Sequence, residues 1–403
     1  MTWRYAEQHC IPPFLLHTVR VPINIEGIMA DLIDYTYWRG DIPFSAVPFN
    51  GIDALVLCQL TYLDYSTIVS SDFNDARLVS DVVSAFKKAP DYKKRADPGL
   101  LINKKTSLLL EKAGSTKRFG SLQIYGYANI IDEEREEQFS ALTYIYNDTA
   151  TVVFRGTDDT LVGWKEDFNM AFMDEIPSQQ DALEYLTELC SIFPGTIRIC
   201  GHSKGGNLAV FGASMLSDNF RERITDIYDF DGPGLNEKVL NSTQYRSMLP
   251  KLHSYYPQFS IIGMLFDHPE KYTVVESEQS GIMQHDPFSW HTAPTGFITL
   301  PELEDGSRFI DKTVNGWFLS LKKEEREQFI SFVFSLIQAT EARTNSELAA
   351  NWLKNSAAVI KAMTEQNPKT RDSAMRVLHL LFKRGAANFP DMKTLLQAKP
   401  NKK

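Results

Sequence analysis

The chain has few cysteines and lacks a long apolar run. Four of its 403 residues are cysteine, and their spacing matches neither a C-x-x-C metal pair nor the dense disulfide set of a small secreted domain. No window approaches the roughly 18 apolar residues that a membrane-spanning helix needs, so no transmembrane segment is expected. Reduced, mostly buried thiols are expected instead, at Cys10, Cys58, Cys190 and Cys200.

The N-terminus lacks the basic segment and apolar stretch of a secretory signal, and positive charge is in the minority overall. The 42 Lys and Arg residues face 51 Asp and Glu residues, which gives a net charge of -9 at pH 7. Nucleic acid is a poor partner for such a chain, because its phosphates are neutralised by Lys and Arg. We therefore expect a soluble, cytoplasmic protein that binds no nucleic acid and carries no metal or cofactor.

Apolar residues are plentiful. They make up 43% of the chain, against 23% charged residues, a balance that supports a large buried core and argues against disorder. The length suits one large catalytic domain with an accessory region.

Helical patterns dominate the chain before about residue 118. Apolar residues recur at helical spacing within Asn24–Tyr37 and run together in Ile52–Leu63. Two further helices are expected at Asp72–Lys88 and Asp97–Glu111, where prolines interrupt the pattern between them.

Strands and helices alternate between about residues 120 and 290, with helices expected at Gln179–Ser191 and Asn207–Leu216. The strand candidates are short runs of β-branched and aromatic residues, separated by charged or turn-forming residues. They are Leu122–Ile131, Phe139–Tyr146, Thr149–Phe154, Thr196–Cys200, Ile224–Phe230, Lys251–Tyr256 and Tyr272–Glu276. This alternation predicts an α/β fold with a mostly parallel central sheet.

The pattern becomes helical after Pro301. Helices are expected at Lys323–Ala339, Trp352–Met363 and Ala374–Lys383, the last one ended by Gly385. We predict a catalytic domain over residues 1–320 and a helical region over residues 321–403. Lys and Arg gather at this C-terminal end, which suits either a solvated helical face or peripheral contact with an anionic membrane.

Ser203 lies in the most informative stretch, Gly201-His202-Ser203-Lys204-Gly205. A strand is predicted before this Gly-x-Ser-x-Gly pattern and a helix after it, which is the context of a nucleophile elbow. The turn must be so tight that the two glycine positions leave no room for side chains, and the helix N-terminus directs N–H groups at a developing oxyanion. Ser203 is therefore the predicted nucleophile; the alternative is a glycine-rich turn whose Ser only caps the helix.

Thr157 ends the stretch Phe154-Arg155-Gly156-Thr157, which closes an earlier strand. An oxyanion hole needs one donor from the residue after the nucleophile and one from a loop after an earlier strand. We assign the first to the backbone N–H of Lys204 and the second to the N–H or hydroxyl of Thr157. The alternative is an ordinary turn at this point.

Together these motifs resemble the class 3 lipase family, whose pattern is Phe-Arg-Gly-Thr, then a Trp and an Asp in the following loop, then Gly-His-Ser-x-Gly-Gly. The resemblance covers about residues 120–295. The residues that match are Phe154–Thr157, Trp164, Asp167, Phe168, Gly201–Ser203 and Gly205–Ala209.

The chain resembles still more closely a bacterial family of α/β hydrolases related to those lipases. Its marks are Trp38–Asp41, Asp231–Gly234 and Gln284–Trp290. This resemblance implies an α/β-hydrolase fold with an N-terminal helical segment and a C-terminal helical appendage, and it fixes no substrate.

The general base should be one of the five histidines that follow Ser203. His285 is the first choice, because it follows the last predicted strand in a turn-rich stretch and matches the closer family's pattern. His291 and His268 are the alternatives. His253 lies within a predicted strand and His379 on the expected surface of a helix.

The acid behind this base is open. Fungal class 3 lipases carry it after the strand that follows the Phe-Gly-x-Pro segment, and the resemblance puts Ser260 at that position. Asp231, at the end of the preceding strand, is the preferred substitute, and Asp267 is the alternative acid. A Ser–His dyad without an acid is the third option.

Two further features allow different interpretations. Lys204 stands where lipases usually carry an apolar residue, and its ammonium group could face solvent or attract an anionic head group. The residues between Thr157 and the elbow could form a lid over the site or simply pack together. The apolar residues in question are Leu161, Trp164, Phe168, Met170, Phe172 and Met173.

The leading hypothesis is a lipase- or esterase-like serine hydrolase that cleaves an acyl-ester or lipid substrate through an acyl-enzyme on Ser203. A second hypothesis is a non-catalytic relative that binds a lipid or a partner protein. A third keeps the site but changes the acyl group to a thioester or a peptide, since the elbow serves all of these reactions. The oligomeric state is not indicated.

Overall fold

The computed structural model describes residues 30–100, 102–266 and 271–388. A twisted sheet runs through the centre of the described chain in the strand order β1-β2-β3-β4-β5-β6-β7-β8-β11. Its strands are β1 (Arg77–Leu78), β2 (Gln123–Asp132), β3 (Glu137–Tyr146), β4 (Thr149–Phe154), β5 (Thr196–His202), β6 (Ile224–Phe230), β7 (Leu252–Pro257), β8 (Thr273–Val275) and β11 (Thr299–Leu300). A separate two-stranded ribbon pairs β9 (Thr292–Ala293) with β10 (Gly296–Phe297).

The sheet is mixed, so the prediction of a mostly parallel sheet was wrong. Neighbours from β4 to β8 are parallel, whereas β1 to β4 and the β8–β11 pair are antiparallel. The physical reason is the length of the connections. Parallel neighbours need a crossover of a dozen or more residues, but only short turns separate β2 from β3 and β3 from β4.

Side chains that alternate along the strands build one core cluster on each face of the sheet, as the pleat requires. Leu142, Val153 and Cys200 belong to the cluster on one face. Ala141 and Val152, their immediate neighbours, belong to the other. The helices that cover the two faces therefore approach the site from opposite sides.

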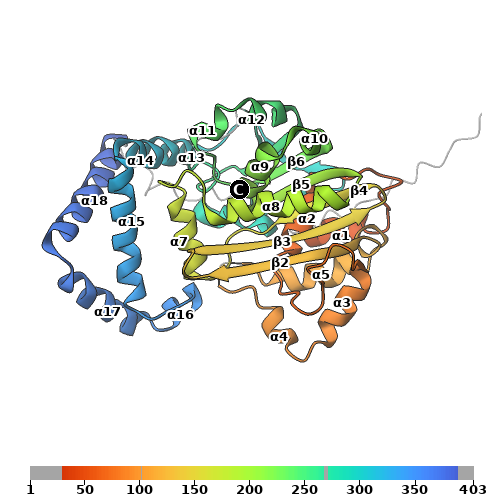
Figure 1. Ribbon diagram of the computed structural model, residues 1–403, viewed down its shortest axis with the longest axis horizontal. Helices are drawn as coiled ribbons and strands as arrows, with labels where there is room; N and C mark the ends of the chain where they lie inside the picture. The colour runs from red at the N-terminus through yellow and green to blue at the C-terminus, as the bar shows by residue number, and fades with distance from the viewer. Residues whose placement is uncertain (1–29, 101, 267–270, 389–403) are drawn as a thin grey trace, which may run out of the picture.

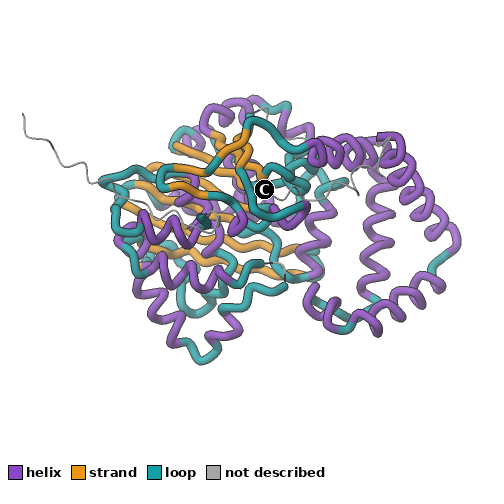
Figure 2. Tube along the Cα trace, turned by 180° about the vertical axis from the view of Figure 1, so that it is seen from behind, coloured by secondary structure: helices purple, strands orange, loops and turns teal. Residues whose placement is uncertain are grey.

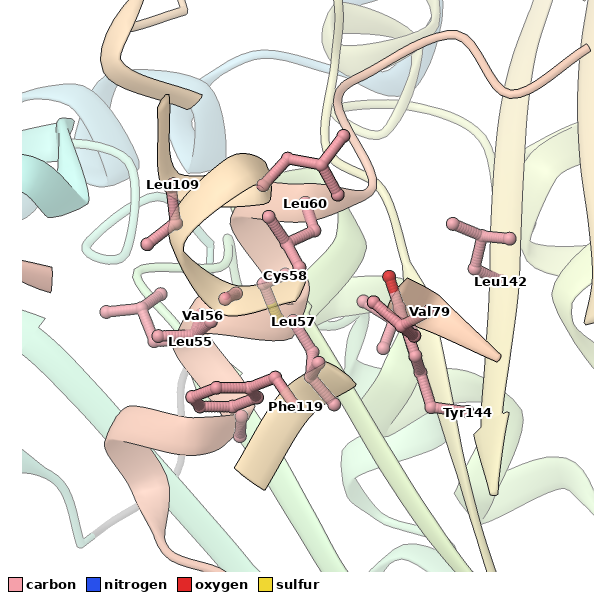
Figure 3. Close-up of a cluster of buried hydrophobic side chains, with 14 of the residues drawn as sticks. Leu55, Val56, Leu57, Cys58, Leu60, Val79, Leu109, Phe119, Leu142 and Tyr144 are labelled. Atoms are coloured by element: carbon pink, nitrogen blue, oxygen red, sulfur yellow. The ribbon is translucent and has the colours of Figure 1, made fainter. Parts of the chain in front are cut away.

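Helix α2 (Gly51–Leu60) forms the centre of the first cluster. Every residue from Ile52 to Leu60 is buried, and Figure 3 shows its side chains among those of Leu109, Phe119 and Tyr144. Full burial stabilises an aliphatic side chain of this size by about 1.5–3 kcal/mol. The helix predicted over Ile52–Leu63 is thus confirmed, and so is its packing on the core.

Residues 24–29 of the first predicted helix lie outside the described residues, and α1 begins at Leu32 after the N-cap Asp31. The other two helices are shorter than predicted. The second is α3, which begins only at Val79 because β1 precedes it, and the third is α5, which begins at Lys105. The helices of this segment are α1 (Leu32–Arg39), α3 (Val79–Lys88), α4 (Tyr92–Arg95), α5 (Lys105–Gly114) and α6 (Lys117–Gly120).

Helices α8 (Pro177–Ile192) and α9 (Lys204–Met215) cover the second face and agree with the predicted helices there. Helix α7 (Leu161–Asn169) follows β4 and precedes α8 in the chain, and it lies at one end of the sheet (Figure 1). The short helices near this face and after β7 are α10 (Asp218–Arg221), α11 (Glu237–Leu240), α12 (Thr243–Met248) and the 3-10 turns η1 (Leu249–Lys251), η2 (Gly281–His285) and η3 (Pro287–Ser289).

The C-terminal helices stand beside α7 rather than on the sheet, as both views show (Figures 1 and 2). The helices of this part are α13 (Asp305–Ile310), the π-helical η4 (Asp311–Asn315), α14 (Gly316–Ser320), α15 (Lys323–Gln338), α16 (Asn345–Ala350), α17 (Trp352–Glu365) and α18 (Pro368–Asn388). Helix α18 runs through Gly385, so the prediction that this glycine ends it was wrong. The predicted boundary after residue 320 falls between α14 and α15.

Two predictions from the sequence concern the cysteines and the absence of a membrane-spanning helix. Cys58, Cys190 and Cys200 are free and buried, as predicted, and Cys10 lies outside the described residues. Among the helices of the described ranges, none combines the length and the apolar character that crossing a membrane requires.

Candidate active site

Ser203 occupies a strained turn between β5 and α9. Its backbone has φ 59° and ψ -133°, a conformation that side-chain-bearing residues rarely adopt outside functional turns. A Cβ at Gly201 would lie 2.0 Å from the Gly205 carbonyl oxygen, and one at Gly205 would lie 2.1 Å from that of Phe154. The strand, the turn and the helix thus have the arrangement of a nucleophile elbow.

Gly156 brings the end of β4 against this elbow. A Cβ there would lie 2.6 Å from the His202 carbonyl oxygen and 3.0 Å from the Ser203 Cβ, so only glycine fits. Thr157 follows directly and is partly buried. The structure therefore brings the loop that carries Thr157 next to Ser203 and to the first residue of α9.

Asp167 of α7 holds the Thr157 side chain. The Thr157 hydroxyl lies 2.6 Å from Asp167 Oδ2, and an ionised carboxylate can only accept, so the hydroxyl donates. Burial raises the pKa of Asp167 to about 6, against the lowering effects of Lys204 and Thr157. Above that pH the Thr157 hydroxyl is engaged, which leaves its backbone N–H as the group that could serve an oxyanion.

The Lys204 side chain is buried, so both predictions for its ammonium group were wrong. It is only 1% exposed and donates to Glu166 Oε2 at 2.6 Å and to the Gln138 carbonyl at 2.7 Å. Glu166 is fully buried and also accepts from the backbone N–H groups of Gln138 and Ser178. Neither solvent nor an anionic head group reaches Lys204 Nζ in this arrangement.

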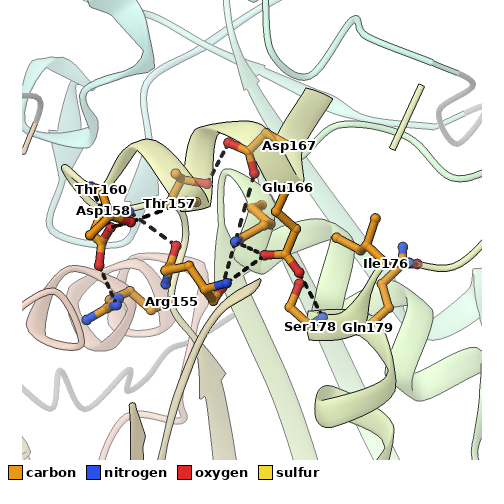
Figure 4. Close-up of polar contacts among 12 residues, drawn as sticks. Arg155, Thr157, Asp158, Thr160, Glu166, Asp167, Ile176, Ser178 and Gln179 are labelled. Atoms are coloured by element: carbon orange, nitrogen blue, oxygen red, sulfur yellow. Dashed lines mark hydrogen bonds and ion pairs between the residues drawn. The ribbon is translucent and has the colours of Figure 1, made fainter. Parts of the chain in front are cut away.

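Two consecutive residues of α7 therefore hold both proposed oxyanion residues. Glu166 binds the side chain of Lys204 and Asp167 binds that of Thr157, in the network that Figure 4 shows around α7. The sequence alone did not indicate Glu166. It lies 38 positions before Lys204, and no pattern over such a distance predicts a buried ion pair.

The apolar residues proposed as a lid pack against the C-terminal helices. Trp164 and Phe172 contact the cluster of Ala171, Ile330 and Phe334. The rings of Phe168 and Phe334 are 5.8 Å apart, although Phe168 remains 44% exposed. A lid role stays a prediction, but in this arrangement α7 is held in place by α15.

His285 and Asp231 lie together, as the preferred assignment required. The distance from His285 Nδ1 to Asp231 Oδ2 is 2.6 Å. Asp231 directly follows β6, is fully buried, and has a positive φ of 51°. Its other oxygen accepts hydrogen bonds from the Ser260 hydroxyl and from the Gly263 N–H.

Ser260 explains the departure from the lipase pattern. It stands where the resemblance expected an acid, and it instead donates a hydrogen bond to Asp231. The carboxylate that faces His285 thus comes from the end of β6, and the position after β7 supports it. Asp267 and His268, the alternatives, lie outside the described residues.

His202 connects His285 to the elbow. Its Nε2 lies 2.9 Å from the His285 carbonyl oxygen, its Nδ1 lies 3.1 Å from the Tyr62 hydroxyl, and the two imidazole rings are 4.6 Å apart. Burial lowers the pKa of His202 well below its ordinary value, and His285 lowers it further, so the ring is neutral. Because a carbonyl only accepts, Nε2 carries the proton and Nδ1 accepts from Tyr62.

Ser203 and His285 are the proposed nucleophile and base. Within the described residues the Ser203 hydroxyl makes no hydrogen bond with the His285 ring. Such bonds are often long in structures without substrate. Sequence reasoning assigned no role to His202 and missed Tyr62, which lies 140 positions before it.

The other candidate histidines face different carboxylates. His291 is 7% exposed and its Nδ1 lies 3.2 Å from Glu276. His253 lies within β7, as predicted, and bonds to Asp226 at 3.1 Å. In the part of the chain that the structure describes, no three side chains of His, Cys, Asp or Glu form a group suited to a metal ion.

Comparison with known proteins gives one family. The family model described as Mbeg1-like matches residues 113–335, a span that includes the elbow, Asp231 and His285. No curated protein matches the chain.

Among solved structures the chain is similar to several lipases. A lipase–propeptide complex of Rhizomucor miehei is 11% identical over 52% of this chain and 75% of that one, with a TM-score of 0.29. Lipase II from Rhizopus niveus is 13% identical over 55% and 84%, with a TM-score of 0.31. A triacylglycerol lipase from Penicillium expansum is 11% identical over 45% and 76%, with a TM-score of 0.29.

Proposed function

The chain belongs to the Mbeg1-like family, and from that premise we propose that it is a serine hydrolase of the α/β-hydrolase type that cleaves carboxylic esters, lipids among them. The observation that carries the proposal is the 2.6 Å contact between His285 and Asp231, held beside the strained elbow of Ser203. A buried carboxylate on Nδ1 leaves the other ring nitrogen to exchange a proton with a serine.

In the proposed reaction Ser203 Oγ attacks the acyl carbon while His285 takes its proton. The oxyanion that forms is stabilised by the backbone N–H groups of Thr157 and Lys204. His285 then returns the proton to the leaving alcohol, and an acyl-enzyme remains on Ser203. Water, deprotonated by the same imidazole, then attacks the acyl carbon, the bond to Ser203 Oγ breaks, and the imidazolium returns the proton to Oγ as the acid leaves. Asp231 orients the ring and stabilises its cation.

The buried carboxylates of α7 have a positioning part in this reaction. A donor shifted by about 1 Å loses much of its effect, and removal of one oxyanion donor costs roughly 10²–10³ in kcat in a serine hydrolase. Glu166 and Asp167 fix the two residues that supply these donors. The network is therefore proposed to keep the oxyanion site formed before substrate arrives.

The first test is covalent labelling by a fluorophosphonate, which reacts with an activated serine. The wild-type protein should take one label per chain, and Ser203→Ala should take none. Asp231→Asn keeps the shape but weakens the support of the imidazole cation, so labelling should slow by several orders of magnitude while the fold persists. Ser71→Ala, a change at an exposed serine, is the control. An unlabelled wild-type protein, beside an esterase that labels, would refute the activity.

A second candidate rests on the absent Ser203–His285 hydrogen bond, which favours a non-catalytic relative that binds an acyl ligand. It predicts ligand binding without labelling. The same labelling experiment therefore separates the two candidates, and ester, thioester and peptide substrates assayed side by side would then assign the acyl group.

A further inference from the structure

A cavity of about 320 Å³ lies between the catalytic core and the C-terminal helices. Its apolar wall comes from the connection between α7 and α8 and from the segments after β6 and in α14. Met170, Phe172, Met173, Leu235 and Phe318 line it. A volume in this range suits a small ligand.

The cavity reaches the helix of the nucleophile. Asn207 lines it and stands four residues after Ser203, which is about one turn or 5.4 Å along α9. The Asn207 amide is fixed, because it accepts from Gln179 at 2.7 Å and donates to the carbonyls of Pro233 and Gly234. This wall is held in place by hydrogen bonds, and it lies about one helical turn from Ser203.

Arg326 of α15 is a second cation that lines the same cavity, besides Lys323. Its Nε donates to the Leu321 carbonyl at 3.2 Å and its Nη1 to the Ala171 carbonyl at 2.9 Å. Within the described residues these contacts leave the N–H groups of Nη2 without an acceptor, and no carboxylate forms an ion pair with the guanidinium. Arg326 is partly buried, and this burial lowers its pKa.

The acidic residues of the cavity do not neutralise Arg326. Asp174 pairs with Lys323 at 3.1 Å, and both side chains are more than half exposed. Glu237 is exposed in the first turn of α11. The uncompensated group is therefore the guanidinium, whose planar fork binds a carboxylate or a phosphate through two parallel hydrogen bonds.

We propose that this cavity binds an anionic amphiphile, with its phosphate or carboxylate on Arg326 and its alkyl chain against the wall of Met170, Phe172 and Leu235. The inference rests on the proposed function in one respect: the amphiphile is taken to be the ester substrate or its acid product. An ester with an anionic group, such as a phospholipid, fits this pattern better than a neutral glyceride.

The test is a binding measurement on Ser203→Ala, in which no turnover can occur. Dodecyl phosphate, dodecanoate and neutral dodecyl maltoside are titrated by calorimetry below their critical micelle concentrations, and inorganic phosphate is titrated in the same way. Dodecyl phosphate and dodecanoate should bind, and each should weaken by about tenfold to a hundredfold in Arg326→Gln, as for the loss of a hydrogen bond to a charged group. Arg326→Lys keeps the charge and should lose less than Arg326→Gln.

The control variant is Arg308→Gln, which removes an exposed guanidinium of α13 that pairs with Glu302. It should leave all four titrations unchanged. Thermal unfolding of each variant checks that the tether between Arg326 and the Ala171 carbonyl is not needed for folding.

Three results would overturn the proposal: dodecyl maltoside binds as tightly as dodecyl phosphate, inorganic phosphate binds as tightly as dodecyl phosphate, or Arg326→Gln has no effect on any of them. The outcome is separate from that of the labelling experiment. Binding that depends on Arg326 in a protein that takes no fluorophosphonate supports the site and refutes the hydrolase.

Discussion

The buried pair of Lys204 and Glu166 gives the sharpest prediction for stability. Lys204→Met removes the ammonium group from a pocket in which the two side chains are 1% and 0% exposed. The Glu166 carboxylate then keeps only the N–H groups of Gln138 and Ser178 as partners. Breaking a buried ion pair from one side costs about 3–5 kcal/mol, a large share of a typical stability of about 5–15 kcal/mol.

Removing the charge of Glu166 instead should lower the free energy of unfolding by a similar amount. Glu166→Gln leaves the Lys204 ammonium with the Gln138 carbonyl at 2.7 Å and with Asp167 only at 3.9 Å. The double variant Lys204→Met/Glu166→Gln leaves no unpaired charge of this pair, so it should lose much less than the sum of the two. A coupling free energy of about 2 kcal/mol or more is expected.

Urea unfolding of the four proteins of this cycle measures the coupling directly. Lys87→Met is the matched control, because Lys87 and Glu111 are also close, at 2.9 Å, but are 50% and 33% exposed. A pair of that kind contributes at most about 1 kcal/mol. The reasoning fails if Lys204→Met costs no more than Lys87→Met, or if the two effects at Lys204 and Glu166 simply add.

Two predictions concern other buried polar groups. Burial raises the pKa of Asp229 from its ordinary value of 3.8 to about 8. Between pH 3.8 and pH 8 the folded protein therefore binds a proton that the unfolded chain does not. The free energy of unfolding falls as the pH rises through this range, by up to about 1.4 kcal/mol per pH unit. Asp229→Asn retains an acceptor for the Gly232 N–H and should flatten this dependence in urea unfolding from pH 5 to 8; equal slopes would contradict it. Tyr62→Phe removes the hydroxyl that donates to His202 Nδ1 and should lower kcat about fivefold to tenfold with little change in KM. An effect on KM alone would argue against a positioning role through His285.

The strands near the elbow could be predicted because their signal is local. Ile224–Phe230 is a β-branched and aromatic run bounded by charge and glycine, and β6 has those bounds. The pairing of β2 with β3 was predicted wrongly, because the parallel arrangement expected for the strands further along the chain was also expected here. The short turn between the two strands already indicates an antiparallel hairpin.

The arrangement of the candidate site could be predicted only where its residues lie within motifs. Ser203 stands in a pattern that requires its neighbours, and Asp231 was preferred because a strand end presents it. Lys204 was misread, because a Lys is mostly exposed and only the fold brings a buried carboxylate to it. Tyr62 carried no signal, since its partner lies on a distant strand.

The attachment of α7 to the C-terminal part of the chain has a consequence for the order in which the protein is made. The backbone of residues 159–161 pairs with that of residues 343–345 through Leu161 and Arg343, Asn345 and Asp159, and the bridge between Thr160 and Thr344. A ribosome adds roughly 5–20 residues per second, so these partners emerge on the order of ten seconds after the elbow. A nascent chain thus contains Ser203 well before α7 has all its supports, and α7 holds the proposed oxyanion residues in full only after residues 343–345 have been made.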